Sequence, residues 1–229
     1  MNALSIDCAV SKLCIAAKKD NNTFKVCMNI GAKQSEKLLP TIDYVLKEIG
    51  LTSKELDYTA VTLGPGTFTG LRLGLSALKA INLAYNVPVY GVLSLDAYAY
   101  PYMKEKSTVI SLIEAKEDEF FYSIYMNGNK SHGDDDKPLE DLLKDLDKED
   151  KILASGPAAK LFVERTNELY PLYNVKCYYP ENDCCDSLFE IAEDMIKNKK
   201  APLSDLDGPV YVRKSEAEIV LEQKQNQKN

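Results

Sequence analysis

The sequence is poor in the residues on which most catalytic and metal sites depend. A single histidine, His132, occurs among 229 residues, so a metal site with two histidine ligands is excluded. His132 lies in the polar run KSHGDDD, and no nucleophile is well placed for a Ser-His-Asp or Cys-His arrangement. We interpret His132 as a solvated loop residue. Asp134, Asp135 and Asp136 lack ligand-like spacing and are expected to form a solvated acidic run.

Paired cysteines and long apolar runs are also missing. None of the six cysteines forms a C-x-x-C pair, so neither a zinc site nor a thioredoxin-like site is indicated. Cys8, Cys14 and Cys27 lie in or near apolar segments, and we expect buried, reduced thiols. No apolar run approaches the roughly 20 residues of a membrane helix, and the first residues lack a signal-peptide pattern. We therefore expect a cytoplasmic protein without membrane contact.

Positive charge is in short supply as well. The chain has 28 Lys and Arg residues against 35 Asp and Glu residues, a formal net charge of −7. Phosphate contacts require clustered Lys and Arg side chains. We therefore expect no direct binding of tRNA or other nucleic acid, and any role in RNA chemistry would be delegated to a partner.

Apolar periodicity predicts a mixed α/β protein. Strands are expected at residues 3–10, 12–19, 23–30, 58–63 and 87–93, and helices at residues 35–49 and 69–85. The second half alternates less regularly. There, GNKSHGDDDK at 128–137 is expected to be a loop or hairpin tip, and PVYVR at 209–213 a short strand or extended segment. No internal repeat is obvious along the chain.

The stretch GPGTFTGLRLG at residues 64–74 concentrates four glycines before a helix. It is not a Walker A loop, because Gly64 and Gly70 are one residue too far apart and Leu71 replaces the lysine. The dinucleotide fingerprint G-x-G-x-x-G fails by one position too. An anion site at the helix start remains one alternative, since the first N–H groups of any helix attract anions.

Close packing of the helix is the other alternative. Gly66, Gly70 and Gly74 recur every four residues, and a glycine inside a helix costs about 1 kcal/mol relative to alanine. Close approach of another backbone would offset this cost. The approaching element can belong to this chain or to a partner, and both possibilities stay open on spacing alone.

Three loops resemble the nucleotide-binding loops of actin-like and sugar-kinase-like ATPases, but without the glycines. In those folds an Asp ends the first strand and a glycine follows soon after. Here Asp7 is followed by Cys8, Ala9 and Val10, whose Cβ atoms narrow the space beside a phosphate. The second hairpin, at residues 114–116, has no glycine either, and in the third loop Gly156 is followed by proline. The nucleotide-binding features are eroded.

These motifs together resemble the TsaB/YeaZ family over residues 4–213. SIDCA matches its opening I-D-T-A/S, and QSEKLLPTID matches H-S-E-x-L-L-P-x-I-D. LGPGTFTGLRLGLSALKAI matches the specific motif G-P-G-S-F-T-G-L-R-I-G almost letter for letter. VPVYGVLSLDA and PVYVR match two further motifs. Gln34 departs from the usual histidine, and Glu114 and Lys116 depart from the usual D-A-R.

The resemblance implies a two-lobed actin-like fold of the ribonuclease H-like class. A first lobe at residues 1–97 would carry the interface helices, followed by a smaller, more divergent lobe at 98–214 and a polar tail at 215–229. It implies no catalytic, cofactor-binding or metal-binding residues in this chain. It leaves room for a nucleotide at a composite interface with partners.

The resemblance also implies partners. They are TsaD, the paralogue that transfers a threonylcarbamoyl group to adenosine of tRNA, and the ATPase TsaE, with a homodimer when the chain is alone. The implied function is a non-catalytic subunit that binds and activates TsaD. The alternatives are a nucleotide-binding or peptidase-like enzyme of this fold, or a stand-alone dimeric scaffold. The expected interface residues are Ser35, Leu38, Leu39, Ile42, Val45, Gly70, Leu71, Arg72, Gly74, Leu75 and Leu78. The expected partner of the Arg72 side chain is a carboxylate, either across the interface or in its own chain, and we favour one in its own chain.

Overall fold

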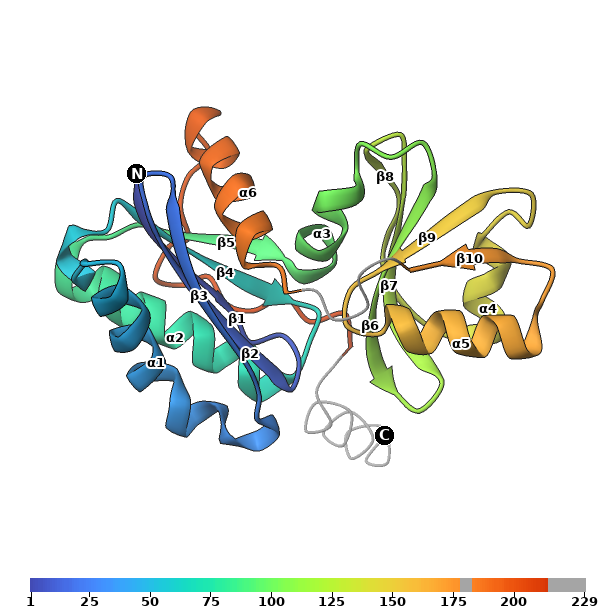
Figure 1. Cartoon of the computed structure of the whole chain (residues 1–229), viewed down its shortest axis with the longest axis horizontal. Coiled ribbons are helices and arrows are strands. Elements are labelled where there is room, and N and C mark those ends of the chain that lie inside the picture. The colour runs from blue at the N-terminus through green and yellow to red at the C-terminus, as the bar shows by residue number, and fades with distance from the viewer. Residues whose placement is uncertain (178–182, 214–229) are drawn as a thin grey trace, which may run out of the picture.

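The computed structural model describes residues 1–177 and 183–213 and folds them into two lobes that lie side by side (Figure 1). Each lobe is built on a five-stranded sheet. The predicted two-lobed actin-like α/β fold, with mixed sheets flanked by helices, is confirmed. The polar tail at 215–229 lies outside the described residues.

The first sheet has the strand order β3-β2-β1-β4-β5. Its strands are β1 (Asn2–Asp7), β2 (Lys12–Lys19), β3 (Asn22–Asn29), β4 (Tyr58–Gly64) and β5 (Val89–Leu93). The first three form an antiparallel meander, and β4 and β5 run parallel to β1. The central strands β1 and β4 are buried almost throughout, whereas β3 alternates between exposed and half-buried residues, as expected of an edge strand.

Helices cover both faces of the first sheet. α1 (Gln34–Glu48) and α2 (Phe68–Tyr85) pack on one face. α3 (Ser94–Ala99) and α6 (Cys185–Lys197) lie on the opposite face. Figure 1 shows that α6, drawn in orange, follows the second lobe in sequence but lies against the blue and cyan first lobe. The segment that we predicted as the second lobe therefore also supplies a helix to the first.

The second sheet repeats the topology of the first, with the order β10-β9-β6-β7-β8. Its strands are β6 (Thr108–Lys116), β7 (Glu119–Met126), β8 (Asn129–Pro138), β9 (Lys151–Ser155) and β10 (Asn174–Lys176). Again a three-stranded antiparallel meander is extended by two parallel strands. The helices of this lobe are α4 (Leu139–Leu142) and α5 (Ala159–Leu169), and short 3-10 turns lie at Gly31–Lys33, Ser53–Glu55, Tyr100–Tyr102 and Leu143–Asp145. The structure thus shows a duplication that is not obvious in the sequence.

The polar run at 128–137 corrects our prediction of a loop or hairpin tip. Most of it forms the edge strand β8, which pairs with β7. Its acidic side chains have partners that a local pattern does not show: Ser123 donates to Asp134 at 2.6 Å, and Arg213 pairs with Asp136. The segment 209–213 contains no strand, and Val210 N donates to Leu63 O at 2.8 Å.

The cysteines differ in exposure. All six are free thiols; Cys8, Cys14, Cys184 and Cys185 are buried, as we expected for the first two, but Cys27 is exposed. Its place on the edge strand β3 explains the difference. Among the described residues, the helices include none with the length and apolar character of a membrane span.

Candidate functional site

The glycine stretch packs against the turn between β1 and β2. A Cβ atom on Gly66 would lie 2.9 Å from Ala9 Cα, and one on Gly70 would overlap the Cys8 carbonyl oxygen. The Thr67 N–H, just before α2, donates to Ala9 O at 2.7 Å. Carbonyl oxygens of the chain itself therefore face the start of α2, and an anion placed there would meet negative dipole ends. The arrangement does not favour the anion-site alternative.

Gly74 packs deeper, against the sheet of its own lobe. A Cβ atom there would lie 3.3 Å from Val61 Cγ2 and 3.4 Å from Ile6 Cγ2. Glycine at every fourth position therefore allows other segments to pack closely against this stretch, as the sequence indicated. The approaching elements are β1, β4 and the β1–β2 turn of this chain, which is one of the two alternatives that the spacing left open. Contact of Gly70 and Gly74 with a partner stays a prediction.

α1 and α2 are neighbours on one face of the first lobe (Figure 1). An apolar groove of about 620 Å³ lies between them. Small residues of α2 line it, namely Ala77, Ala80 and Ala84, and beside them lie Leu39 of α1 and Tyr85 of α2. The lining also includes Asp43 and Lys47, which form an exposed ion pair of 2.8 Å. The spacing of three and four residues between the alanines is a sequence signal that we had not used.

The two helices also expose large apolar side chains. Leu39 is 65% exposed and Leu83 is 88% exposed, and Tyr44, Phe68 and Tyr85 are each about half exposed. Of these, Leu39 and Tyr85 line the groove, whereas Tyr44 packs on Phe24 and Phe68 stacks on Tyr211. An exposed apolar patch of this kind indicates a binding surface for another macromolecule. We call the groove, with Leu39 and Tyr85 in its lining, the α1/α2 surface.

A cleft of about 480 Å³ lies between the lobes, lined by Asp7 and Val10 of the first lobe and by Glu114 and Pro157 of the second. Asp7 is only 2% exposed. Tyr98 Oη donates to Asp7 Oδ2 at 2.6 Å, and Thr62 Oγ1 donates to Oδ1 at 3.2 Å. Burial raises the pKa of Asp7, although these hydrogen bonds oppose the shift. The carboxylate is thus engaged inside the first lobe.

Comparison with known proteins identifies the family. A family model described as "TsaD: tRNA N6-adenosine threonylcarbamoyltransferase" matches residues 30–203. An uncharacterized protein of Mycobacterium tuberculosis is 31% identical over 80% of this chain and 76% of its own length. A Buchnera aphidicola protein named "tRNA threonylcarbamoyladenosine biosynthesis protein TsaB" is 27% identical over 65% of this chain and 71% of its own.

The structural comparison agrees on the fold. The solved structure of "YeaZ from Pseudomonas aeruginosa" superposes with a TM-score of 0.73 at 20% identity, covering 92% of this chain and 99% of that one. The chain belongs to the TsaB/YeaZ family. The departures that the motifs showed can now be placed within the family's fold.

Gln34, which stands where the TsaB/YeaZ motif usually has histidine, has a structural role here. Its side chain is buried, and Gln34 Nε2 donates to Val10 O at 2.6 Å. The amide thus ties the start of α1 to the β1–β2 turn. Glu114 and Lys116, the other departures, lie at the end of β6, and Glu114 lines the interlobe cleft.

The interface residues that we predicted from the TsaB/YeaZ resemblance divide by exposure. Ser35, Leu39 and Arg72 are exposed. The others are buried in the first lobe, although Ile42 also lines the groove between α1 and α2: Leu38, Ile42, Val45, Gly70, Leu71, Gly74, Leu75 and Leu78. Apart from Ile42, these residues use the apolar stripe of each helix to pack on their own sheet, and their direct contact with a partner stays a prediction.

Arg72 pairs within the chain, as we favoured, but its partners are aromatic rings. The guanidinium lies 3.7 Å from the centroid of the Phe68 ring, and Arg72 Nε donates to Tyr211 Oη at 3.0 Å. Phe68 and Tyr211 stack with their centroids 5.0 Å apart. The cation thus holds the segment before Arg213 on the start of α2 by a cation–π contact and a hydrogen bond.

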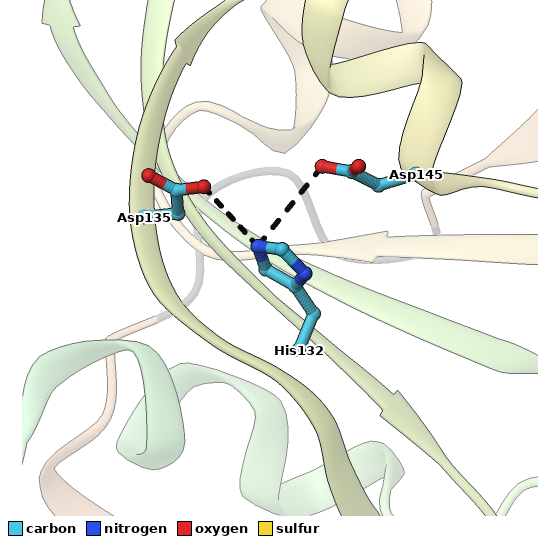
Figure 2. Close-up of side chains that lie close together, drawn as sticks. All are labelled: His132, Asp135 and Asp145. Carbon is cyan, nitrogen blue, oxygen red and sulfur yellow. Dashed lines mark hydrogen bonds and ion pairs between the residues drawn. The ribbon is translucent and has the colours of Figure 1, made fainter.

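His132 lies on β8 rather than in a solvated loop. Its ring stacks on Tyr122, and Nε2 lies 3.2 Å from Asp135 Oδ2 and 4.0 Å from Asp145 Oδ2 (Figure 2). Lys137 Nζ already contacts both carboxylates, at 3.3 and 2.8 Å. Burial raises the pKa of each acid, but hydrogen bonds, including those from Lys137, outweigh it and hold the pKa below the usual range. Because the Lys137 ammonium group already pairs with the two carboxylates that a metal ion would need, we assign no metal to this cluster.

Proposed function

We propose that this chain is a non-catalytic subunit that binds a TsaD protein and activates it in threonylcarbamoyl transfer to adenosine of tRNA. The observation that carries the proposal is the α1/α2 surface, an apolar groove lined by the exposed side chains of Leu39 and Tyr85 on a member of the TsaB/YeaZ family. A groove of this kind accepts the apolar face of a partner helix. We propose the same surface for self-association when TsaD is absent, and TsaE as a further member of the assembly on the basis of family membership alone.

A role without chemistry of its own is supported by the interlobe cleft. Asp7 receives hydrogen bonds from Tyr98, Thr62 and the Ala9 N–H, so its oxygens are directed into the lobe. Ala9 and Val10 line the cleft where the related ATPases have glycine. Delegation of the transfer reaction and of tRNA contact to TsaD is also in keeping with the net charge of −7.

The experiment compares two identical substitutions on exposed helical leucines. Leu39→Asp places a carboxylate on the α1/α2 surface, and Leu169→Asp places one on α5, where the leucine is similarly exposed, at 57% against 65%. Each variant is titrated with purified TsaD of the same organism, and folding is checked by circular dichroism.

We expect Leu39→Asp to weaken the affinity at least about tenfold, because a charge without a partner would be buried in the contact. Leu169→Asp should bind like the wild type. Ala84→Arg, which fills the groove without touching the core, should act like Leu39→Asp. Unchanged affinity of both groove variants would refute the proposal. Loss of dimer with TsaD binding intact, measured by sedimentation velocity, would leave the groove as a dimer contact only.

A further inference from the structure

Two cysteines face each other across the antiparallel strands β2 and β3. The register pairs Cys14 directly with Cys27 and runs without a shift from Lys12 opposite Asn29 to Lys19 opposite Asn22. Directly opposed residues of such a pair have Cα atoms about 4.5 or 5.5 Å apart. Both values fall within the span of about 4.4–6.8 Å that a disulfide bridges. The two side chains lie on the same face of the sheet.

The two thiols differ in access. Cys27 is exposed on the edge strand β3, whereas Cys14 has no exposed surface on the inner strand β2. A dissolved oxidant can therefore reach only the Cys27 sulfur from solvent. The Cys14 thiol is shielded from solvent, but it lies opposite Cys27 and can react with an oxidised Cys27 sulfur.

The surroundings of Cys27 favour its thiolate. A hydrogen bond from the Cys14 thiol lowers the pKa of Cys27, and the nearby charges of Lys12 and Lys25 act in the same direction against burial and Asp183. The same hydrogen bond, together with burial, raises the pKa of Cys14. The thiolate is the reactive form of cysteine, so the exposed member of the pair is also the more nucleophilic one.

We propose that Cys14 and Cys27 form a redox pair, in which a peroxide oxidises Cys27 and Cys14 then closes a cross-strand disulfide. In the first step the Cys27 thiolate attacks a peroxide oxygen. The O–O bond breaks, hydroxide (or alkoxide) leaves, and Cys27 becomes a sulfenic acid. In the second step the Cys14 sulfur attacks the Cys27 sulfur; the S–O bond breaks, the S–S bond forms, and the Cys14 proton leaves with the oxygen as water.

The bond would tie the edge strand to the sheet beneath the start of α6. Lys25, two residues before Cys27, already pairs with Asp183 and Asp186 in that region. Oxidation would therefore fix β3 covalently in a place where ion pairs now hold it. The inference does not depend on the proposed TsaD contact, because the Cys14–Cys27 face of the sheet is opposite to α1 and α2.

Peptide mapping tests the proposal directly. The full chain is treated with hydrogen peroxide, its remaining thiols are alkylated, and tryptic peptides are analysed without reduction. Lysines separate the two cysteines into the peptides LCIAAK (13–18) and VCMNIGAK (26–33), and Cys177 falls into a third peptide. We expect the first two to appear as one cross-linked species lacking two hydrogens, which separates on reduction.

Three variants sharpen the result. Cys27→Ser should abolish the cross-link, Cys177→Ser should leave it unchanged, and Cys14→Ser should leave a sulfenic acid on Cys27 that dimedone traps. In the wild type, Cys27 should react about tenfold faster than Cys177, whose pKa is raised by burial. A cross-link from Cys14 to the peptide with Cys185, a dimer linked through Cys27, or equal rates at Cys27 and Cys177 would overturn the proposal. Because Cys27 is exposed, Cys27→Ser should fold, and it keeps the proposal testable even if Cys14→Ser does not fold.

Discussion

Replacement of Gly70 by alanine tests whether the glycine spacing serves the chain's own packing. The added Cβ atom would overlap the Cys8 carbonyl oxygen and lie 2.6 Å from Thr67 Oγ1 and 3.0 Å from Gln34 Oε1. The first obstacle is a backbone atom, which cannot rotate away as a side chain can. Either the β1–β2 turn or the first turn of α2 has to move.

The magnitude follows from two opposing effects. Alanine is favoured over glycine in a helix by about 1 kcal/mol, but overpacking a tight site costs typically about 1–3 kcal/mol and occasionally more. Because the obstacle is backbone, we place the cost at the upper end and expect a net loss of about 2 kcal/mol. For a chain of this length each kcal/mol lowers Tm by about 2–4 °C. We therefore expect Tm to fall by about 4–8 °C.

Gly74→Ala is the matched control on the same helix. Its Cβ atom would meet the methyl groups of Val61 and Ile6 at 3.3 and 3.4 Å, and these can shift by a few tenths of an ångström. Helix propensity then offsets the tight contact, so we expect a change in Tm of less than about 2 °C. Thermal unfolding followed by circular dichroism measures both variants. A Gly70→Ala variant as stable as the wild type would refute our account, and if it also lost TsaD binding, the glycine would serve a partner after all.

Two further predictions concern the half-buried Glu193 and the buried Asp7, and both are checked by thermal unfolding across pH. Burial raises the pKa of Glu193, but the hydrogen bonds from Lys18 and Tyr58 outweigh it and hold the pKa low. The interaction thus stabilises the fold at pH values above the pKa that Glu193 has in the unfolded chain, and it is lost as pH falls through the lower pKa that Glu193 has in the folded chain. We therefore expect Glu193→Gln to lower the free energy of unfolding by about 1 kcal/mol at pH 7 and by little in acid. Tyr98→Phe removes the donor at 2.6 Å from Asp7, so we expect a loss of about 1–3 kcal/mol. That loss should be larger at pH 8 than at pH 4, because the pKa of Asp7 is raised above its usual value and its charged form depends most on the donor. An equal loss at both pH values would contradict the second prediction.

The elements of the first lobe could be predicted because their apolar patterns are local. The meander and the two long helices follow alternation and helical spacing that any short window of sequence contains. β8 could not be predicted in this way. Its acidic residues look solvated in sequence, but Asp134 is paired with Ser123 on β7 and Asp136 with Arg213 near the end of the described chain. Partners at such separations are set by the tertiary structure.

The candidate site was predicted at the level of helices but not of residues. The apolar stripe of α1 and α2 indicated the two helices that line the groove, yet Leu38, Val45 and Leu78 use that stripe to pack on their own sheet. Spacing shows that a glycine permits a close approach and does not show which backbone approaches. The residues left for a partner lie beside the stripe, and Ala80 and Ala84 stand out only once α1 is placed next to them.

The duplicated topology explains why the surface belongs to the first lobe alone. Both sheets have the same strand order, and in each lobe one connection precedes the fourth strand and one precedes the fifth. In the first lobe these connections are α1 and α2, of 15 and 18 residues. In the second they are α4 and α5, of 4 and 11 residues. A groove between neighbouring helices needs two long helices, so the second lobe cannot form its counterpart. A partner that recognises such a groove would therefore bind the first lobe and not the second.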